Sequence, residues 1–250
     1  MSEGIYQHFR GYEQYVSKLR KAVERYRKYP VNIAFDYLTP DRQRIAESVL
    51  GNGIPHQFLG GYPDALKKRL VIGEDIDPEE YICCMKATYN EKFNTITHRD
   101  VTGALYNLQI DTEKFGDLWV EGDSIYLYCQ PQLSDFISGS FTQISRCTVH
   151  FEKIDEFAAQ RFSFRDFQVT VSSFRLDVII SAIIRKSRSK AQEMIRSENI
   201  NVNFQTIEDC DFLCNNGDIV SVRGTGRFII ANTVAVTKSG NTVVLVRQFV

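Results

Sequence analysis

A cluster of basic residues at positions 185–190 offers the clearest binding chemistry in the sequence. It reads Arg-Lys-Ser-Arg-Ser-Lys, so four of its six residues are cations. Ser187 can cap a helix that begins inside the cluster, and Ser189 with Gln192 offers a competing capping register. In either register, free N–H groups and the positive end of the helix dipole lie beside the cationic side chains. This arrangement predicts an anion site, and a phosphate backbone is the anion with regularly spaced oxygens.

Two helices and a small sheet must position this cluster. Apolar residues with helical spacing precede and follow it: Leu176, Ile179, Ile180, Ile183 and Ile184, then Ala191, Met194 and Ile195. Residues 200–204 alternate as a strand, an Asn216-Gly217-Asp218 turn follows, and residues 219–223 form the next strand. A charged turn between two amphipathic helices can also be a solvated face that binds nothing. The wider order of elements therefore decides between the two interpretations.

This order resembles the ribosomal-protein-S-four-type RNA-binding domain, which is also called the αL motif. The matching residues are Arg175-Leu176-Asp177, Ser187-Arg188-Ser189-Lys190-Ala191, Val202-Asn203 and Gly217-Asp218-Ile219-Val220. The further run at residues 221–228, Ser-Val-Arg-Gly-Thr-Gly-Arg-Phe, is similar to the YlmH family of bacterial RNA-binding proteins, which carry this module at the C-terminus. RNA binding is therefore the favoured interpretation.

We predict that three parts of this module contact RNA. The basic cluster contacts phosphates through Arg185, Lys186, Ser187, Arg188 and Lys190. Arg175 and Asn203 shape the cleft. Arg223 and Arg227 hold RNA from the sheet side and flank a flexible turn, Gly224-Thr225-Gly226, which lacks the third glycine and the helix of a dinucleotide loop. Most such contacts position RNA, so specificity comes from RNA shape.

The YlmH resemblance implies a non-catalytic protein that binds ribosomal RNA or tRNA on the large ribosomal subunit. Family members act in ribosome-associated quality control, where nascent chains remain on the peptidyl-tRNA of stalled ribosomes, and are linked to cell division in Gram-positive bacteria. We expect neither a cofactor nor a small-molecule substrate.

The composition restricts the class of protein. A net charge of −1 excludes a globally basic protein, so any RNA affinity must come from local patches. No apolar run approaches the roughly 18 residues that span a bilayer, and the N-terminus lacks the order of a signal peptide. We therefore expect a cytoplasmic protein without membrane insertion. The six cysteines form no C-x-x-C pair and the four histidines are scattered, which predicts reduced, mostly buried cysteines and no metal.

We predict an α+β, multidomain fold in three parts. Residues 1–75 form a small, mainly helical domain. Residues 76–165 form a domain like the RNA-recognition motif (RRM), in the split β-α-β order of strand, helix, strand, strand, helix, strand. Residues 166–250 form the αL module of two helices and a small antiparallel sheet, which a C-terminal β-hairpin extends.

The N-terminal domain is expected to contain several helices. Residues 5–29 have a helical apolar face, and a second helix begins with Thr39 as its cap and Pro40 in its first turn. In the YlmH resemblance, a corner such as Gly60-Gly61-Tyr62 precedes a helix, which is expected here at residues 64–70.

The middle domain offers little chemistry of its own. It has no aromatic motif of the Lys/Arg-Gly-Phe-Gly-Phe kind, so we expect no stacking platform there. It also departs from the family pattern at residues 111–113, where Asp-Thr-Glu replaces cations. His98-Arg99-Asp100 matches the first residues of a kinase catalytic loop, but the Asn required five positions after the Asp is Leu105. We expect Asp100 to cap a helix instead.

Two other functions fit the same module. The first is an RNA-modifying enzyme, such as a pseudouridine synthase or a methyltransferase, although the sequence shows no glycine-rich cofactor turn and no nucleophile with a nearby base. The second is a protein adaptor at the division site, in which the acidic residues 208–211 and the N-terminal helix would bind partners.

Overall fold

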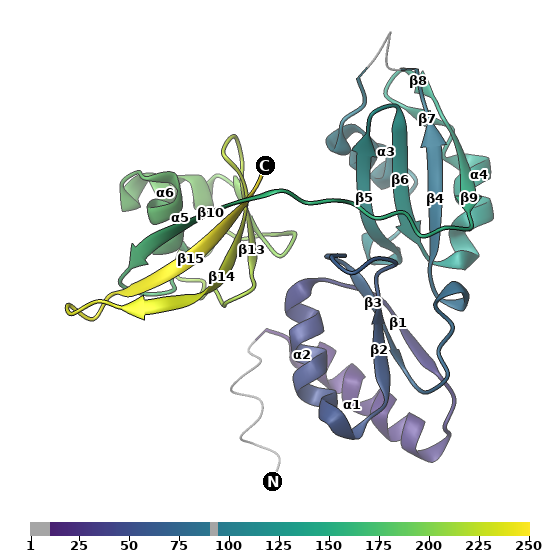
Figure 1. Ribbon diagram of the computed structural model, residues 1–250, viewed down its shortest axis with the longest axis horizontal. Coiled ribbons are helices and arrows are strands. Elements are labelled where there is room, and N and C mark those ends of the chain that lie inside the picture. Colours follow the sequence, from purple (N-terminus) through teal and green to yellow (C-terminus); the bar gives the residue numbers. More distant parts are fainter. Residues whose placement is uncertain (1–10, 91–94) are drawn as a thin grey trace. The chain divides into compact units, whose positions relative to one another are not determined.

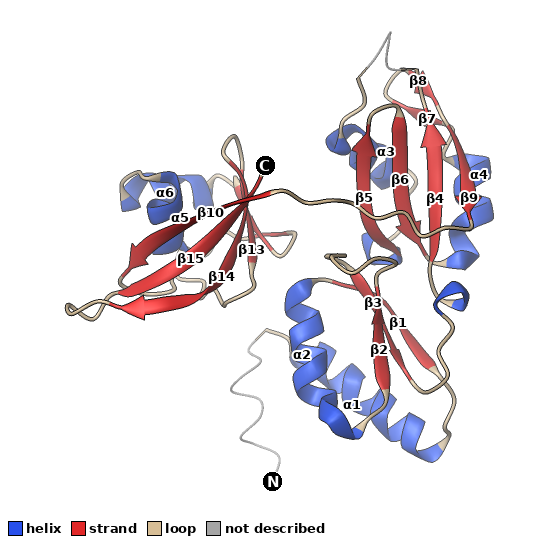
Figure 2. Ribbon diagram, viewed as in Figure 1, coloured by secondary structure: helices blue, strands red, loops and turns tan. Residues whose placement is uncertain are grey.

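The computed structural model describes residues 11–90 and 95–250, so the start of the helix predicted at residues 5–29 lies outside the described residues. The chain forms two compact units, one ending at Gln160 and one from Arg161 to Val250 (Figure 1). Each unit combines helices with sheets (Figure 2). Over the described residues, six α-helices and several sheets make this a mixed α+β fold.

The N-terminal part of the first unit contains two helices and a three-stranded sheet. Its elements are α1 (Glu13–Lys28), β1 (Ile33–Leu38), α2 (Pro40–Leu50), β2 (His56–Leu59) and β3 (Lys68–Ile72). The strands are antiparallel in the order β1-β3-β2. Val16 and Leu19 on α1 share a core with α2 and the sheet. Thr39 is the N-cap of α2 and Pro40 lies in its first turn, as predicted.

The helix expected at residues 64–70 is wrong, because Lys68–Ile72 is the central strand β3. Leu70, Val71 and Ile72 are all buried. A strand between two partners is apolar at consecutive positions, and a short run of this kind does not distinguish a strand from a helix. The domain is therefore less helical than expected. The glycine corner before β3 is present: Gly61 has φ +85°, and a Cβ atom there would lie 2.2 Å from the Tyr128 ring.

The rest of the first unit has the element order of a split β-α-β fold. Its elements are β4 (Cys83–Thr88), α3 (His98–Asn107), β5 (Phe115–Glu121), β6 (Ser124–Cys129), α4 (Ser134–Ser140), β7 (Gln143–Ile144), β8 (Cys147–Thr148) and β9 (His150–Ile154). The four long strands are antiparallel in the order β5-β6-β4-β9, and α3 and α4 cover one face (Figure 1). Short 3₁₀ turns occur at Gly51–Gly53, Pro78–Glu80, Thr112–Lys114 and Pro131–Leu133.

A buried carboxylate joins the three-stranded and the four-stranded sheets of the first unit. Asp117 on β5 accepts hydrogen bonds from the Tyr62 hydroxyl at 2.6 Å and from the N–H groups of Leu66 and Lys67 at 2.7 and 3.1 Å. Burial raises the pKa of Asp117, while these donors act in the opposite direction. The Tyr37 hydroxyl on β1 also donates to the backbone carbonyl of Cys129, at 3.1 Å. Polar contacts therefore connect the two sheets in the interior.

The second unit is a six-stranded sheet with two helices on one face. Its elements are β10 (Phe164–Val171), α5 (Leu176–Ile184), α6 (Arg188–Arg196), β11 (Ile200–Val202), β12 (Gln205–Thr206), β13 (Ile219–Val222), β14 (Gly226–Val236) and β15 (Thr242–Phe249). The strand order is β10-β15-β14-β13-β11-β12, so the predicted hairpin β14–β15 does extend the sheet. Both predicted helices are present, and their apolar residues share one core with the strands.

The two units do not reproduce the three predicted domains one by one. The described parts of residues 1–75 contribute to the same unit as residues 76–160, and the second unit begins at Arg161. Strand β10 starts at Phe164, two residues before the predicted start of the third domain. The division of the first unit into two domains at residue 75 stays a prediction.

All six cysteines are buried and free, which agrees with the predicted burial. Two of them are cross-strand neighbours, with 3.4 Å between the sulfurs of Cys83 and Cys129. In the ranges 11–90 and 95–250, no group of three or more His, Cys, Asp and Glu residues could hold a metal ion. No helix within these same ranges has the length and apolar character to cross a membrane.

Candidate nucleic-acid interface

The α5–α6 connection forms the basic turn, which we define as residues 185–190. Helix α5 ends at Ile184, and its C-cap Arg185 has a left-handed backbone with φ 55° and ψ 45°. The Ser181 hydroxyl donates to the carbonyl oxygen of Lys186 at 2.7 Å, and this bond closes the turn. Ser187 is the N-cap of α6, and its hydroxyl accepts from the Lys190 N–H at 3.2 Å. The register capped by Ser187 is therefore the correct one of the two that the sequence allows.

The basic turn is exposed along its whole length. All six of its residues have exposed side chains, and the cations Arg185, Lys186, Arg188 and Lys190 are among them. Lys190 also pairs with Glu193 at 2.7 Å, but both partners are exposed, and such pairs contribute less than about 1 kcal/mol. The first N–H groups of α6 lie among these cations, as an anion site requires.

A buried carboxylate fixes the inner side of the turn. Asp177 on α5 is fully buried and accepts from Arg188 Nε at 2.8 Å and from Gln192 Nε2 at 2.7 Å. Arg175 also donates to it, through Nε and Nη2 at 3.3 Å. Burial alone would raise the pKa of Asp177, but these donors outweigh burial and lower it to about 2. Arg188 keeps 52% of its side chain exposed, so the contact orients it without removing it from solvent.

Two predicted site residues are part of the protein's own structure. Arg175 bridges Asp177 and Asp211, so it connects α5 to the loop before β13. Asn203 is buried, donates to Asp218 at 3.0 Å and accepts from the Ile219 N–H at 3.0 Å. Asn203 thereby holds the turn between β11 and β12, and its expected role in shaping an RNA cleft stays a prediction.

The remaining predicted residues lie away from the basic turn. The N–H of Arg223 donates to the carbonyl of Asn199, just beyond the C-terminal end of α6, whereas the basic turn lies at the N-terminal end. A helix of this length measures about 13 Å, so the two groups do not surround one point. Gly224 occupies the turn after β13 with φ +76°. Arg227 lies over the rings of Phe204 and Phe249, at 5.8 and 5.5 Å from their centroids.

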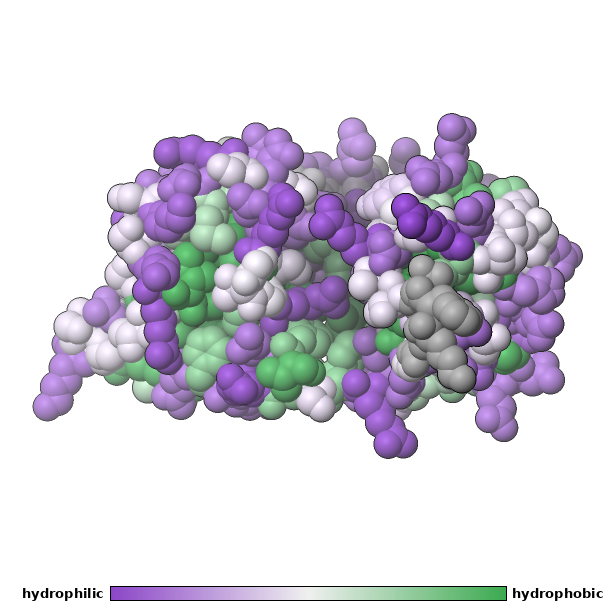
Figure 3. Space-filling model, turned by 90° about the horizontal axis from the view of Figure 1, so that it is seen from above, coloured by the Kyte–Doolittle hydropathy of each residue, from purple (hydrophilic) through white to green (hydrophobic). Residues whose placement is uncertain are grey.

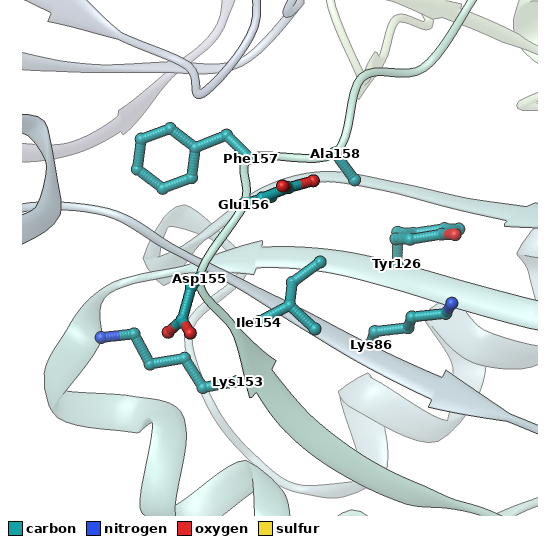
Figure 4. A pocket seen from close by; sticks show the side chains of 8 residues that line it. All are labelled: Lys86, Tyr126, Lys153, Ile154, Asp155, Glu156, Phe157 and Ala158. Atoms are coloured by element: carbon teal, nitrogen blue, oxygen red, sulfur yellow. The ribbon is translucent and has the colours of Figure 1, made fainter.

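The first unit contains a second surface that the sequence did not predict. An open pocket of about 630 Å³ borders the sheet face opposite α3 and α4, and Figure 4 shows its lining. Its lining residues are Lys86, Tyr126, Lys153, Ile154, Asp155, Glu156, Phe157 and Ala158. Lys86 Nζ lies 5.4 Å from the centroid of the Tyr126 ring. The Trp119 ring stacks on the Tyr126 ring, with 4.8 Å between the two ring centroids. We call this site the Tyr126 pocket.

The Tyr126 pocket combines aromatic rings with mixed charge, and the Tyr126 ring is already stacked on Trp119. Tyr126 is half-buried on β6 beside Lys86 on β4. The Tyr128 hydroxyl donates to the Ala158 carbonyl at 2.7 Å and holds the segment after β9 along the pocket. Its two cations are balanced by Asp155 and Glu156, which makes it less attractive to phosphate than the basic turn. The alternation of aromatic and aliphatic residues at 125–128 was the signal that could have revealed this face.

The His98-Arg99-Asp100 motif has a structural role. Thr97, and not Asp100, is the N-cap of α3, so the predicted cap is wrong. Asp100 stands at the third helical position and accepts from the Thr97 N–H at 2.8 Å, while the Thr97 hydroxyl oxygen accepts from the Asp100 N–H. This reciprocal capping box occupies the carboxylate of Asp100.

Known proteins resemble this chain in sequence and in fold. A family model described as "Putative RNA-binding domain in YlmH" matches residues 78–157. The "Ribosome-associated protein quality control protein P2" of Bacillus subtilis (strain 168) is 33% identical over 247 residues, covering 94% of this chain and 94% of the relative. The solved structure "Cell division protein ylmH from Streptococcus pneumoniae" has a TM-score of 0.50 at 20% identity, covering 60% of this chain and 96% of that chain.

The three findings agree with one another. The structural match shows a shared fold, and the family model matches the region that contains the Tyr126 pocket. The sequence identity to the Bacillus relative extends well beyond that region and includes most of the second unit. The chain belongs to the YlmH family.

Proposed function

We propose that this protein is a non-catalytic, cytoplasmic RNA-binding protein of the translation apparatus. One observation carries the proposal: the basic turn presents four exposed cations around the N-terminus of α6, and buried Asp177 orients one of them. In this proposal the RNA is structured ribosomal RNA or tRNA on the large ribosomal subunit. The protein acts on stalled peptidyl-tRNA complexes, with a link to cell division.

The comparisons support the proposal at a coarser level. The printed name of the Bacillus relative refers to ribosome-associated quality control, and the matching family model describes RNA binding. The fold match bears the words "cell division protein" in its title. Transfer of these roles to this chain is part of the proposal.

The contacts of the basic turn favour structured RNA over a specific sequence. Arg185, Lys186 and Lys190 offer flexible point contacts to phosphate oxygens, while Arg188 is pre-oriented by its Nε bond to Asp177. None of these groups is held in a geometry that reads a base edge. Such contacts fix the position of the RNA, and the shape of the RNA then supplies selectivity.

The two alternatives receive less support. The RNA-modifying alternative would need a nucleophile with a nearby base, and the sequence shows none. In the acidic loop at residues 208–211, Cys210 is buried and Asp211 pairs with Arg175. Two of its four residues therefore contribute to the fold, while Glu208 and Asp209 stay exposed.

Co-sedimentation with purified ribosomal subunits across a salt series tests the proposal. The informative variant changes Arg185, Lys186 and Lys190 to Glu and leaves the contacts of Asp177 intact. We expect salt-sensitive association of the wild type with the large subunit, lost in the variant. The slope of log affinity against log salt falls by roughly 2–3 when three phosphate contacts disappear. Thermal unfolding confirms that the variant is folded.

A matched control changes Lys21, Arg25 and Lys28, which are exposed cations on α1, to Glu. It carries the same change in net charge but leaves the basic turn untouched. Equal loss in both variants would mean that binding follows net charge, and loss in the control alone would move the site to α1. Absence of any association with ribosomal subunits or tRNA would refute the proposed function.

A further inference from the structure

The second unit has a sheet face that its helices do not cover. Residues of alternate positions, such as Val169, Phe228, Ile230, Val244 and Val246, are buried in the core shared with α5 and α6. Successive residues of a strand point to opposite faces of the sheet. The residues that alternate with these core residues on β10, β14 and β15 therefore lie on the face away from the helices. They include Phe164, Arg227, Arg247 and Phe249.

Aromatic rings and arginines on this face form a continuous row of planar groups. Phe164 and Phe249 are direct cross-strand partners with ring centroids 4.9 Å apart. The Arg247 guanidinium lies 6.0 Å from the Phe164 ring on one side. On the other side the Arg227 guanidinium lies between Phe249 and Phe204, at 5.5 and 5.8 Å. We define the aromatic–arginine face as these five residues.

Phe204 is an unusual residue for its position. It is the second of two residues in the tight connection between β11 and β12, where Asn203 has φ 48° and Phe204 has φ 69°. Turns with two positive φ angles favour glycine at the second position, and a bulky ring is strained there. Despite this, Phe204 is 37% exposed, so the strain is not offset by burial of the ring. Its ring extends the row of planar groups at the edge of the sheet.

The chemistry of this face matches an unpaired RNA strand. Aromatic rings and guanidinium planes stack on bases of any sequence, and arginines also attract phosphates. Two cations are present against one carboxylate, Asp166, which lies 3.4 Å from Arg247. Figure 3 shows hydrophobic and hydrophilic side chains side by side on the surface that it displays, and on the aromatic–arginine face the rings of Phe164 and Phe249 are in contact with arginines. An aliphatic protein-docking surface would lack this alternation of rings and charges.

We propose that the aromatic–arginine face binds unpaired bases of single-stranded RNA. This inference rests on the proposed function, because it assigns a second surface of the same unit to RNA. The aromatic–arginine face differs from the basic turn in location and in chemistry. The basic turn lies at the helices and offers positive charge. The aromatic–arginine face lies on the opposite side of the sheet and offers aromatic rings as well. An RNA that reaches both surfaces must have a flexible segment next to a structured one.

Fluorescence anisotropy with a labelled oligoadenylate tests this inference. Phe204→Gly removes a ring and also relieves the positive φ, so the variant should be at least as stable as the wild type. Phe164→Ala removes the exposed ring that lies between Arg247 and Phe249 in the row. We expect each variant to bind the oligoadenylate roughly tenfold more weakly, since base–aromatic stacking contributes on that scale. The control is Phe136→Ala, which removes a ring of similar exposure from α4 in the other unit.

The outcomes separate this inference from the proposed function. Oligoadenylate binding that is lost in Phe204→Gly and Phe164→Ala, but is unchanged in Phe136→Ala, would support RNA binding by the aromatic–arginine face. Loss in the Arg185, Lys186 and Lys190 variant alone would overturn it and leave the proposed function standing. Lack of wild-type binding to the oligoadenylate would also overturn it, while co-sedimentation with ribosomes still judges the proposed function. A dimer in sedimentation velocity that Phe164→Ala dissociates would show that a second copy covers the face.

Discussion

Asp177 links the interior of the second unit to its charged surface. It lies at the start of α5, fully buried, and its carboxylate receives donors from Arg175, Arg188 and Gln192. A buried charge is tolerated only when it is paired and hydrogen-bonded, and this one is. The same contacts that satisfy Asp177 restrict the rotamers of Arg188. In the proposed function, this restriction partly pre-organises the basic turn for binding a phosphate.

Asp177→Asn should destabilise the protein in a pH-dependent way. The pKa of Asp177 is lowered from 3.8 to about 2, so its contribution is present above pH 4 and is lost as the pH falls towards 2. A shift of this size corresponds to about 2–3 kcal/mol at pH 7. Urea denaturation between pH 7 and pH 2 should show the wild-type advantage shrinking across this window. A constant difference between the two proteins at all pH values would contradict this account.

The control for that experiment is Asp166→Asn. Asp166 and Arg247 are both about half exposed and lie 3.4 Å apart. Exposed pairs of this kind contribute less than about 1 kcal/mol, so this substitution should change stability little at any pH.

Gly61→Ala should destabilise the first unit by about 3 kcal/mol or more. A Cβ atom at this position would lie 2.2 Å from the Tyr128 ring, and the backbone has φ +85°. Overpacking and left-handed backbone strain each cost about 1–3 kcal/mol. Gly103→Ala on α3 is the control, because its Cβ would meet nothing within 4 Å and alanine favours a helix. Equal stability of the two variants in urea denaturation would show that the turn at Gly61 can shift to accommodate a Cβ atom.

At the level of helices, the N-cap decides where α6 begins among the cations. Ser187→Ala should cost about 1 kcal/mol, because it removes the hydroxyl that accepts from the Lys190 N–H. Ser189→Ala, two residues further along and within the first turn of the helix, should change stability by less than about 0.5 kcal/mol. Chemical denaturation of both variants measures the difference. A larger loss for Ser189→Ala would mean that the helix uses the other register in solution.

The elements that the sequence predicted best are those with strong local periodicity. Both helices α5 and α6 follow from apolar spacing, and the hairpin β14–β15 follows from two apolar strands around a glycine-containing turn. Strand β3 did not follow, because its buried run resembles a helical segment and its partners β1 and β2 lie elsewhere in the chain. Local patterns do not encode which segments will flank a strand.

Parts of the candidate site could not be predicted from the sequence, because they also depend on which segments pack together. The residues of the basic turn adjoin one another in sequence, so composition alone revealed them. The role of Asp177 depends on how α5 packs against α6, since Arg188 follows it by 11 positions. The Tyr126 pocket combines residues of β4, β6, β9 and the segment after β9, which only the sheet order brings together. The burial of Asn203, which is expected to shape the cleft, is not visible in the sequence.

At the scale of the whole molecule, the second unit should fold by itself. Its core contains residues from all its long elements, from Val169 on β10 to Val246 on β15, and every member of that core lies within the unit. A fragment of residues 161–250 should therefore unfold cooperatively in urea, monitored by circular dichroism. A gradual, non-cooperative transition would show that this unit depends on the first one. The fragment also allows the oligoadenylate experiment without the Tyr126 pocket.

The pairing of β10 with β15 places the entry and exit of the second unit side by side. Phe164 faces Phe249 across the ladder, and the N–H of Val250 donates to the carbonyl of Ser163 at 3.0 Å. A unit with adjacent ends can be inserted into a loop of another protein, or circularly permuted, without distorting either partner. New ends at the exposed β14–β15 turn would leave the basic turn and its helices uninterrupted. The second unit is thus suited to being inserted into other proteins as an intact domain.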